Sequence, residues 1–159
     1  MAAVTVWISS LCRSDPGYGG WAWVRRIDGE AGPSAIKGAA GGERRTTSAT
    51  MSLTALSEAL DGLSDLPAGT AVTLRFLDPD LAGQLVTSDG DYATTEPDAW
   101  AAARAAVAKR PILELVPAAP ADAASGFLNA WAEFGLDTAK SRGSFKAAIP
   151  KPNLMKFPG

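Results

Sequence analysis

The chain has 159 residues, 47% of them hydrophobic, a net charge of −2, no histidine and one cysteine, Cys12. This length supports one hydrophobic core and is short for two ordinary domains. The missing histidines and the single cysteine exclude internal disulfides, multi-cysteine zinc sites and histidine-based nucleophile pairs. With no apolar run of membrane-spanning length and no basic leader at the start, we expect a cytoplasmic protein.

Hydrophobic periodicity predicts alternating strands and helices. Alternation with a period of two marks the strands, and turn dipeptides such as Asp28-Gly29 separate them. A leucine stripe at helical spacing, Leu53, Leu56, Leu60 and Leu63, marks the first helix. The predicted elements are strands at 2–9, 19–27 and 34–47, a helix at 50–66, a strand at 71–77, helices at 78–86 and 97–110 around a polar loop, a strand at 111–116 and a helix at 126–140.

The charge is divided unevenly along the chain. Residues 138–159 contain five basic side chains and no acidic one, whereas the rest of the chain has a charge of −7. We therefore separate a domain at 1–137 from a basic, proline-containing tail at 138–159. The tail either binds the phosphate backbone of a nucleic acid or docks on an apolar face of this chain or of a second subunit. Its large apolar residues favour docking: Ile149, Leu154, Met155 and Phe157.

Several segments, in this order, resemble motifs of the ribonuclease H family, type 1. "DPGYGGWAWV" is similar to its first glycine-rich turn, "RTTSATMSLTALSEAL" to the entry of its first helix, and "FLNAWAE" to its last helix. The resemblance covers residues 3–137. It implies an α/β fold with a five-stranded mixed sheet, three antiparallel strands followed by parallel ones, and helices on both faces.

Members of this family cut the RNA strand of RNA–DNA hybrids with two divalent metals held by four carboxylates. Matching the motifs places Ser9, Ser52, Leu77 and Glu133 at those four positions. Serine hydroxyls are weak, uncharged ligands and leucine offers none, so we expect no bound metal or other cofactor. A slip of one residue in the fourth strand would replace Leu77 by Asp78. Such a slip would reverse the facing of the strand, and a helix N-cap and first-turn charge are the preferred explanation of Asp78 and Asp80.

The resemblance therefore predicts a pseudoenzyme: a ribonuclease H-like domain with a degenerate metal site that binds nucleic acid or protein. One alternative is an active, Mg²⁺- or Mn²⁺-dependent hybrid ribonuclease with the atypical acids Asp78, Asp80 and Glu133. Another is a structural protein that forms a homodimer through the tail. The sequence does not name the biological role, the partner or the oligomeric state.

Nucleic-acid contacts are expected at two places. Asp15 in the glycine-rich turn and Arg44, Arg45 and Thr47 before the first helix match the family's phosphate-contacting segments. The tail adds Lys140, Arg142 and Lys146, which have the charge that a phosphate backbone attracts. A solvated surface explains the same residues equally well. We interpret Trp21 and Trp23 as core residues rather than as a base-stacking surface.

Overall fold

The computed structural model describes residues 3–14, 16–77, 81, 83–85, 91–110, 113–118 and 122–159. In chain order, its elements are β1 (Ala3–Arg13), β2 (Gly17–Ile27), the 3-10 turn η1 (Pro33–Ala35), β3 (Ile36–Thr46), α1 (Ser48–Asp61), β4 (Ala71–Phe76), α3 (Asp91–Thr95), α4 (Pro97–Ala108), β5 (Leu113–Pro117), α5 (Ala123–Arg142), β6 (Phe145–Ala148) and α6 (Lys151–Leu154). Leu81 and residues 83–85 are also helical. The polar loop expected before the 97–110 helix contains the short helix α3.

The described strands form one mixed sheet in the order β5-β4-β1-β2-β3-β6. Strands β1, β2 and β3 are antiparallel neighbours, and β4 and β5 run parallel to β1. The expected mixed sheet, with three antiparallel strands followed by parallel ones, is confirmed, but the expected count of five strands is wrong. The sixth strand, β6, comes from the tail and pairs antiparallel with β3.

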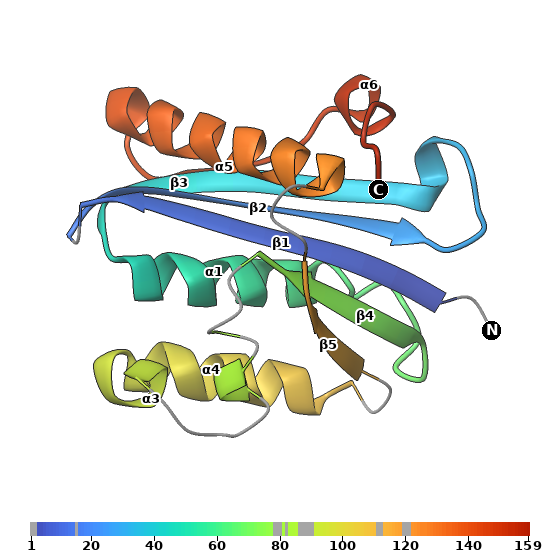
Figure 1. Ribbon diagram of the computed structural model, residues 1–159, viewed down its shortest axis with the longest axis horizontal. Coiled ribbons are helices and arrows are strands. Elements are labelled where there is room, and N and C mark those ends of the chain that lie inside the picture. The colour runs from blue at the N-terminus through green and yellow to red at the C-terminus, as the bar shows by residue number, and fades with distance from the viewer. Residues whose placement is uncertain are drawn as a thin grey trace.

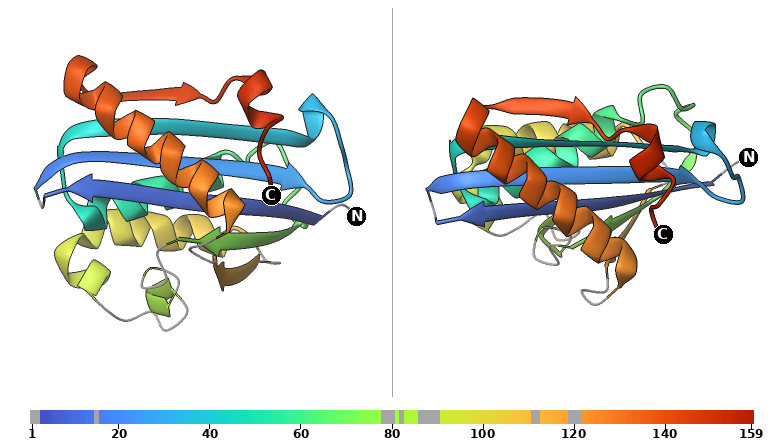
Figure 2. Two further views of the ribbon diagram at one scale, coloured as in Figure 1. Left: turned by 45° about the horizontal axis from the view of Figure 1, so that its top comes forward. Right: turned by 90° about the horizontal axis from the view of Figure 1, so that it is seen from above.

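Helices cover both faces of this sheet (Figure 1). Helix α1 lies on one face with α4 packed beyond it, and α5 and α6 lie on the other face. Figure 2 shows that α5 crosses the strands diagonally and that α6 occupies a corner of the same face beside it. We refer below to the α1 face and the α5 face of the sheet.

Large side chains fill the space between the sheet and α1. The four leucines of the predicted stripe are all buried, which confirms that interpretation. Trp21 and Trp23 from β2 and Trp100 from α4 belong to the same core, so their expected role in packing is also confirmed. The helix begins at a Thr47 N-cap, whose side chain accepts a hydrogen bond from the Thr50 amide.

The backbone of α5 is in close contact with the backbone of the sheet. A Cβ built on Gly20 or Gly42 of the sheet would collide with the α5 backbone, and one on Gly135 of α5 would collide with the carbonyl of Gly41. Side chains at these positions are therefore incompatible with the observed helix–sheet distance. Small residues thus decide where α5 crosses the sheet.

The tail completes the α5 face. The boundary expected at residue 137 falls inside α5, which continues to Arg142. Ile149, Leu154 and Phe157 are buried against the core of that face, as the docking hypothesis for this chain expected, whereas Met155 is half exposed. The Phe157 ring lies edge-on to Trp7 of β1, with centroids 4.8 Å apart.

A charged contact ties the turn after α1 to the sheet. The guanidinium of Arg25 on β2 is buried and donates two hydrogen bonds to the carboxylate of Asp65, at 2.5 and 2.8 Å. The same group donates to the carbonyl of Gly62, and Lys37 donates to Asp65. The hydrogen bonds from Arg25 hold the pKa of Asp65 well below its ordinary value of 3.8.

None of the helices in the described ranges combines the length and the apolar character needed to cross a bilayer.

Candidate functional site

Ser9 lies on the α5 face of β1 and is almost completely buried. Side chains alternate between the two faces along the strand, so Ser9 shares its face with Trp7, in the core of the α5 face, and with Leu11, which packs against that core. Its hydroxyl donates a hydrogen bond of 2.7 Å to Oδ1 of Asn129 on α5. The side chain that meets Ser9 is therefore a neutral amide.

Ser52 contacts the next residue of β1 instead. The hydroxyls of Ser52 on α1 and Ser10 are 3.1 Å apart, on the α1 face of the sheet. Ser9, Ser10 and Ser52 nevertheless line one small pocket, together with Ile8, Phe76 and Leu81. Two of the four expected positions therefore line this pocket together with Ser10, and Asn129 contacts Ser9.

Leu77 follows β4 directly and lies beside Ser9. Ile8 pairs with Phe76 in the parallel β1–β4 register, and the amide of Leu77 donates to the carbonyl of Ile8 at 3.1 Å. The Leu77 side chain packs on the α5-face core. The alternative acids Asp78 and Asp80 lie outside the described residues, as does Asp15.

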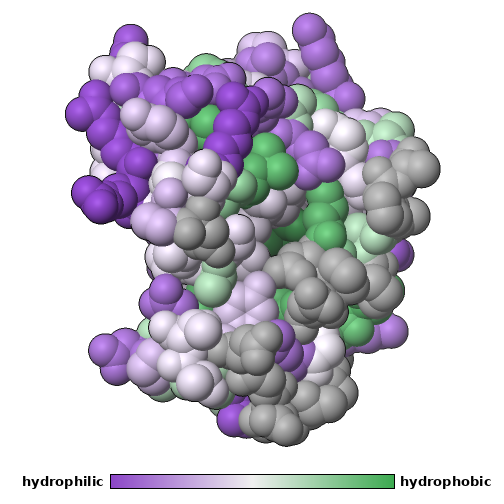
Figure 3. Space-filling model, turned by 60° about the vertical axis from the view of Figure 1, so that its left-hand side comes forward, coloured by the Kyte–Doolittle hydropathy of each residue, from purple (hydrophilic) through white to green (hydrophobic). Residues whose placement is uncertain are grey.

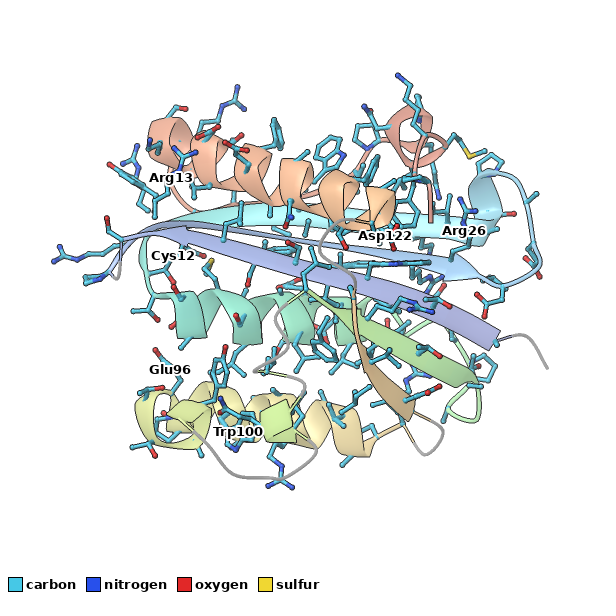
Figure 4. All side chains as sticks on the ribbon, viewed as in Figure 1. Cys12, Arg13, Arg26, Glu96, Trp100 and Asp122 are labelled. Carbon is cyan, nitrogen blue, oxygen red and sulfur yellow. The ribbon has the colours of Figure 1, made fainter. Side chains whose placement is uncertain are left out.

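Glu133 contacts Arg13 rather than these serines. Its carboxylate accepts a hydrogen bond of 2.9 Å from Arg13, and both side chains are more than half exposed. Figure 4 shows Arg13 on the α5 side of the sheet and its neighbour Cys12 on the α1 side, at the far end of β1. Asn129 lies one helical turn before Glu133, and it is Asn129 that faces Ser9.

Asn129 and Ser10 are not among the residues that the sequence predicts at this place. The available signal for Asn129 was its spacing of four residues from Glu133, which places both on one side of a helix. For Ser10, the signal was strand alternation, because consecutive residues point to opposite faces. Within the described residues, no group of three or more Asp, Glu, His or Cys side chains is arranged to hold a metal ion.

Two of the basic residues expected to contact phosphate, Arg44 and Lys140, lie together at the end of α5. Arg44 donates to the carbonyls of Ala139 and Lys140 at the end of α5, and the Lys140 ammonium lies 5.3 Å from the centre of the Tyr18 ring. Arg44, Lys140 and Tyr18 with neighbouring Arg13 make up what we call the basic end. Figure 3 views the molecule from this side, with hydrophilic side chains gathered at its upper left.

The other expected contact residues have different surroundings. Thr47 caps α1, and its hydroxyl lies 3.4 Å from a Glu96 oxygen that also accepts from Thr50 at 2.7 Å. Lys146 on β6 forms an ion pair of 3.2 Å with Glu58. Arg45 and Arg142 are exposed.

Comparison with known proteins connects this geometry to a class. No family model matches the chain. The chain is 37% identical over 65 residues to the ribonuclease H of Campylobacter curvus, and the match spans 41% of this chain and only 40% of that protein. The sequence match therefore covers less than half of either chain.

Solved structures resemble nearly the whole chain. The N-terminal RNase H domain of a Mycobacterium tuberculosis protein superposes with a TM-score of 0.76 at 15% identity, covering 89% of this chain and 98% of that one. RNase H1 from Halobacterium salinarum gives 0.67 at 23% identity, over 86% and 99%. LC11-RNase H1 in complex with an RNA/DNA hybrid gives 0.71 at 17%, over 86% and 99%.

These likenesses define the class of protein: it is an α/β protein with the ribonuclease H fold. The resemblance of its sequence to the ribonuclease H family, expected from the motifs, is confirmed.

Proposed function

We propose that this chain is a non-catalytic ribonuclease H-like domain that binds nucleic acid through its basic end. One observation carries the proposal: Ser9 bonds to Asn129, and Ser10 meets Ser52, where the family's reaction needs carboxylates. A two-metal reaction requires hard, negatively charged oxygen ligands that hold both cations and so stabilise the attacking and leaving oxygens. Neutral hydroxyl and amide groups do not fit a pair of Mg²⁺ ions.

The contacts of Glu133 support the same conclusion. A metal ligand on α5 would have to face β1 where Ser9 lies, yet the carboxylate of Glu133 is held by Arg13 at the protein surface. The helix presents Asn129 to Ser9 instead. The active-enzyme alternative then depends on Asp78 and Asp80, and activity measurements test it directly.

The basic end supports nucleic acid as the ligand. The guanidinium of Arg44 is fixed by two carbonyls at the end of α5, and the ammonium of Lys140 is fixed over the ring of Tyr18. Cations held in place lose little side-chain entropy when they contact phosphates. A related fold, LC11-RNase H1, has been solved in complex with an RNA/DNA hybrid, so a hybrid is the ligand to test first.

The first experiment measures cleavage. The purified chain is incubated with a labelled RNA–DNA hybrid and Mg²⁺ or Mn²⁺, and we expect no cleavage above the background without protein. Cleavage by the unmodified chain that Asp78→Asn abolishes would contradict the proposal and establish the atypical acid set.

The second experiment measures binding by fluorescence anisotropy across a salt series. The double variant Arg44→Ala/Lys140→Ala should bind the hybrid more weakly and reduce the slope of log K against log salt by about 2, one for each lost phosphate contact. Lys109→Ala, at the end of α4, is the matched control and should leave the slope unchanged. Equal affinity of the double variant and the control would contradict binding through the basic end.

A further inference from the structure

Tyr18 is an exposed aromatic side chain at the basic end. It is the second residue of β2, pairs with Arg13 of β1 and is 39% exposed. Figure 1 shows the turn between β1 and β2 below the end of α5, at the left of the molecule. From that helix end, the ammonium of Lys140 lies 5.3 Å from the ring centre. Tyr18 belongs to neither of the two cores that the described residues form, so its exposed ring surface is open to a ligand.

The cations next to this ring are not paired with acids. Within the described residues, Arg44 and Lys140 form no ion pair, because the guanidinium donates to two backbone carbonyls and the ammonium lies over the ring. Arg13 differs from them, since Glu133 offsets its charge at 2.9 Å. Two exposed positive charges beside Tyr18 are therefore left for an outside anion, and phosphate groups are the anions that such a surface attracts.

We infer, on the basis of the proposed function, that the basic end binds a single-stranded segment of nucleic acid. An unpaired base stacks on Tyr18, and the adjoining phosphates contact Arg44 and Lys140. Each nucleotide joins a base to a phosphate, so an aromatic ring with cations beside it matches both parts. In a duplex, neighbouring base pairs cover the faces of each base, which leaves only unpaired or terminal bases free to stack on a protein ring. Tyr18 therefore selects for single strands, whereas the cations contact any phosphate backbone.

A second exposed aromatic residue has different surroundings. Phe134 on α5 is 48% exposed, and its ring lies edge-on to two neighbouring aromatic rings. The hollow that it lines contains one acid and one base, Asp137 and Arg142. Their opposite charges offset each other, so Phe134 does not combine an exposed ring with an excess of positive charge. This difference makes Phe134 a matched control for Tyr18.

Fluorescence anisotropy with a labelled oligothymidylate, whose bases do not pair with one another, tests the inference. Tyr18→Ala should weaken binding at least about fivefold, the effect of losing one stacked base. Tyr18→Leu keeps apolar volume but has no aromatic face, so it should weaken binding to a similar extent. Tyr18→Phe keeps the ring and should retain the affinity. Phe134→Ala is the control and should leave the affinity unchanged.

Two further measurements separate stacking from charge. The slope of log K against log salt for oligothymidylate should be the same for Tyr18→Ala and the unmodified chain, because no phosphate contact is removed. A blunt RNA–DNA hybrid should bind to Tyr18→Ala and to the unmodified chain with equal affinity, which also shows that the variant is folded.

Unchanged affinity of Tyr18→Ala for oligothymidylate would overturn the inference. If hybrid binding still depended on Arg44 and Lys140 in that case, the proposed function would stand without it. Equal weakening of hybrid and oligothymidylate binding by Tyr18→Ala would also overturn it, because Tyr18 would then not select for single strands. Binding of neither nucleic acid by the unmodified chain would overturn both the inference and the proposed function.

Discussion

The α1 face and the α5 face of the same sheet are covered in different ways. On the α1 face, leucines and tryptophans fill a thick layer between strands and helix. On the α5 face, glycines let helix and strand backbones touch, and the tail fills the corner that the helix leaves open. One face therefore depends on side-chain volume, whereas the other depends also on glycines where the helix crosses the strands and on a segment distant in sequence.

The two faces also divide the serine positions. Ser9 turns to the α5 face and bonds to Asn129, while Ser10 turns to the α1 face and meets Ser52. The two pairs are neutral hydrogen bonds on opposite faces of β1. Substitutions on the two faces should therefore lower the free energy of unfolding for different physical reasons.

The largest expected effect is loss of the tail. Deleting residues 143–159 exposes the surface that Ile149, Leu154 and Phe157 cover, and burial of such side chains stabilises a fold by about 1.5–3 kcal/mol each. We expect the free energy of unfolding to fall by about 5 kcal/mol, measured by urea denaturation. Met155→Ala, at a half-exposed position, is the control and should change it by less than about 0.5 kcal/mol. An unchanged transition would contradict docking of the tail.

A methyl group between α5 and the sheet should have the next largest effect. Gly135→Ala forces a Cβ against the carbonyl of Gly41 and should cost about 3 kcal/mol through overpacking. Leu56→Ala on the α1 face should cost a similar amount by leaving a cavity. Thermal denaturation compares the two. A tolerated Gly135→Ala would show that α5 can move away from the sheet, so close contact would not be what holds it.

The contact of Arg25 with Asp65 should have a smaller effect that depends on pH. Asp65→Asn leaves the buried guanidinium of Arg25 without its carboxylate and should lower the free energy of unfolding by about 2 kcal/mol at pH 7. The loss is smaller than for a fully buried ion pair because half of the Asp65 side chain is in solvent. Since the folded-state pKa of Asp65 is lowered, its contribution is present above pH 3.8 and is lost as the pH falls further. The difference in unfolding free energy between the two proteins should be the same at pH 7 and pH 5 and smaller at pH 3. A constant difference would contradict this assignment.

The serine contacts should have the smallest effects. Ser9→Ala leaves Oδ1 of Asn129 without its donor and should cost about 1 kcal/mol. The double variant Ser9→Ala/Asn129→Ala should cost less than the sum of the single changes, which a double-mutant cycle measures. Strict additivity would mean that the two side chains do not interact.

Much of the fold was predictable because it depends on local periodicity. Alternating residues predicted the first strands, and the leucine stripe predicted α1 and its buried side. The sixth strand was not predictable, because "FKAA" has no strand pattern of its own and forms β6 only through its hydrogen bonds to β3. The nearness of Ser9 and Ser52, which line one pocket, was predictable, but the contact of Asn129 with Ser9 was not, because it depends on the angle at which α5 crosses the sheet.

The sequence by itself determined the order of the elements and the chemical types available near the end of β1. Residue identity is local information, and so are strand and helix periods. The tertiary structure decided which of these residues meet. It turned Ser9 toward Asn129 and Glu133 toward Arg13, and it placed Arg44 at the end of α5. Such contacts join residues some hundred positions apart, and packing of whole elements sets them rather than any local preference.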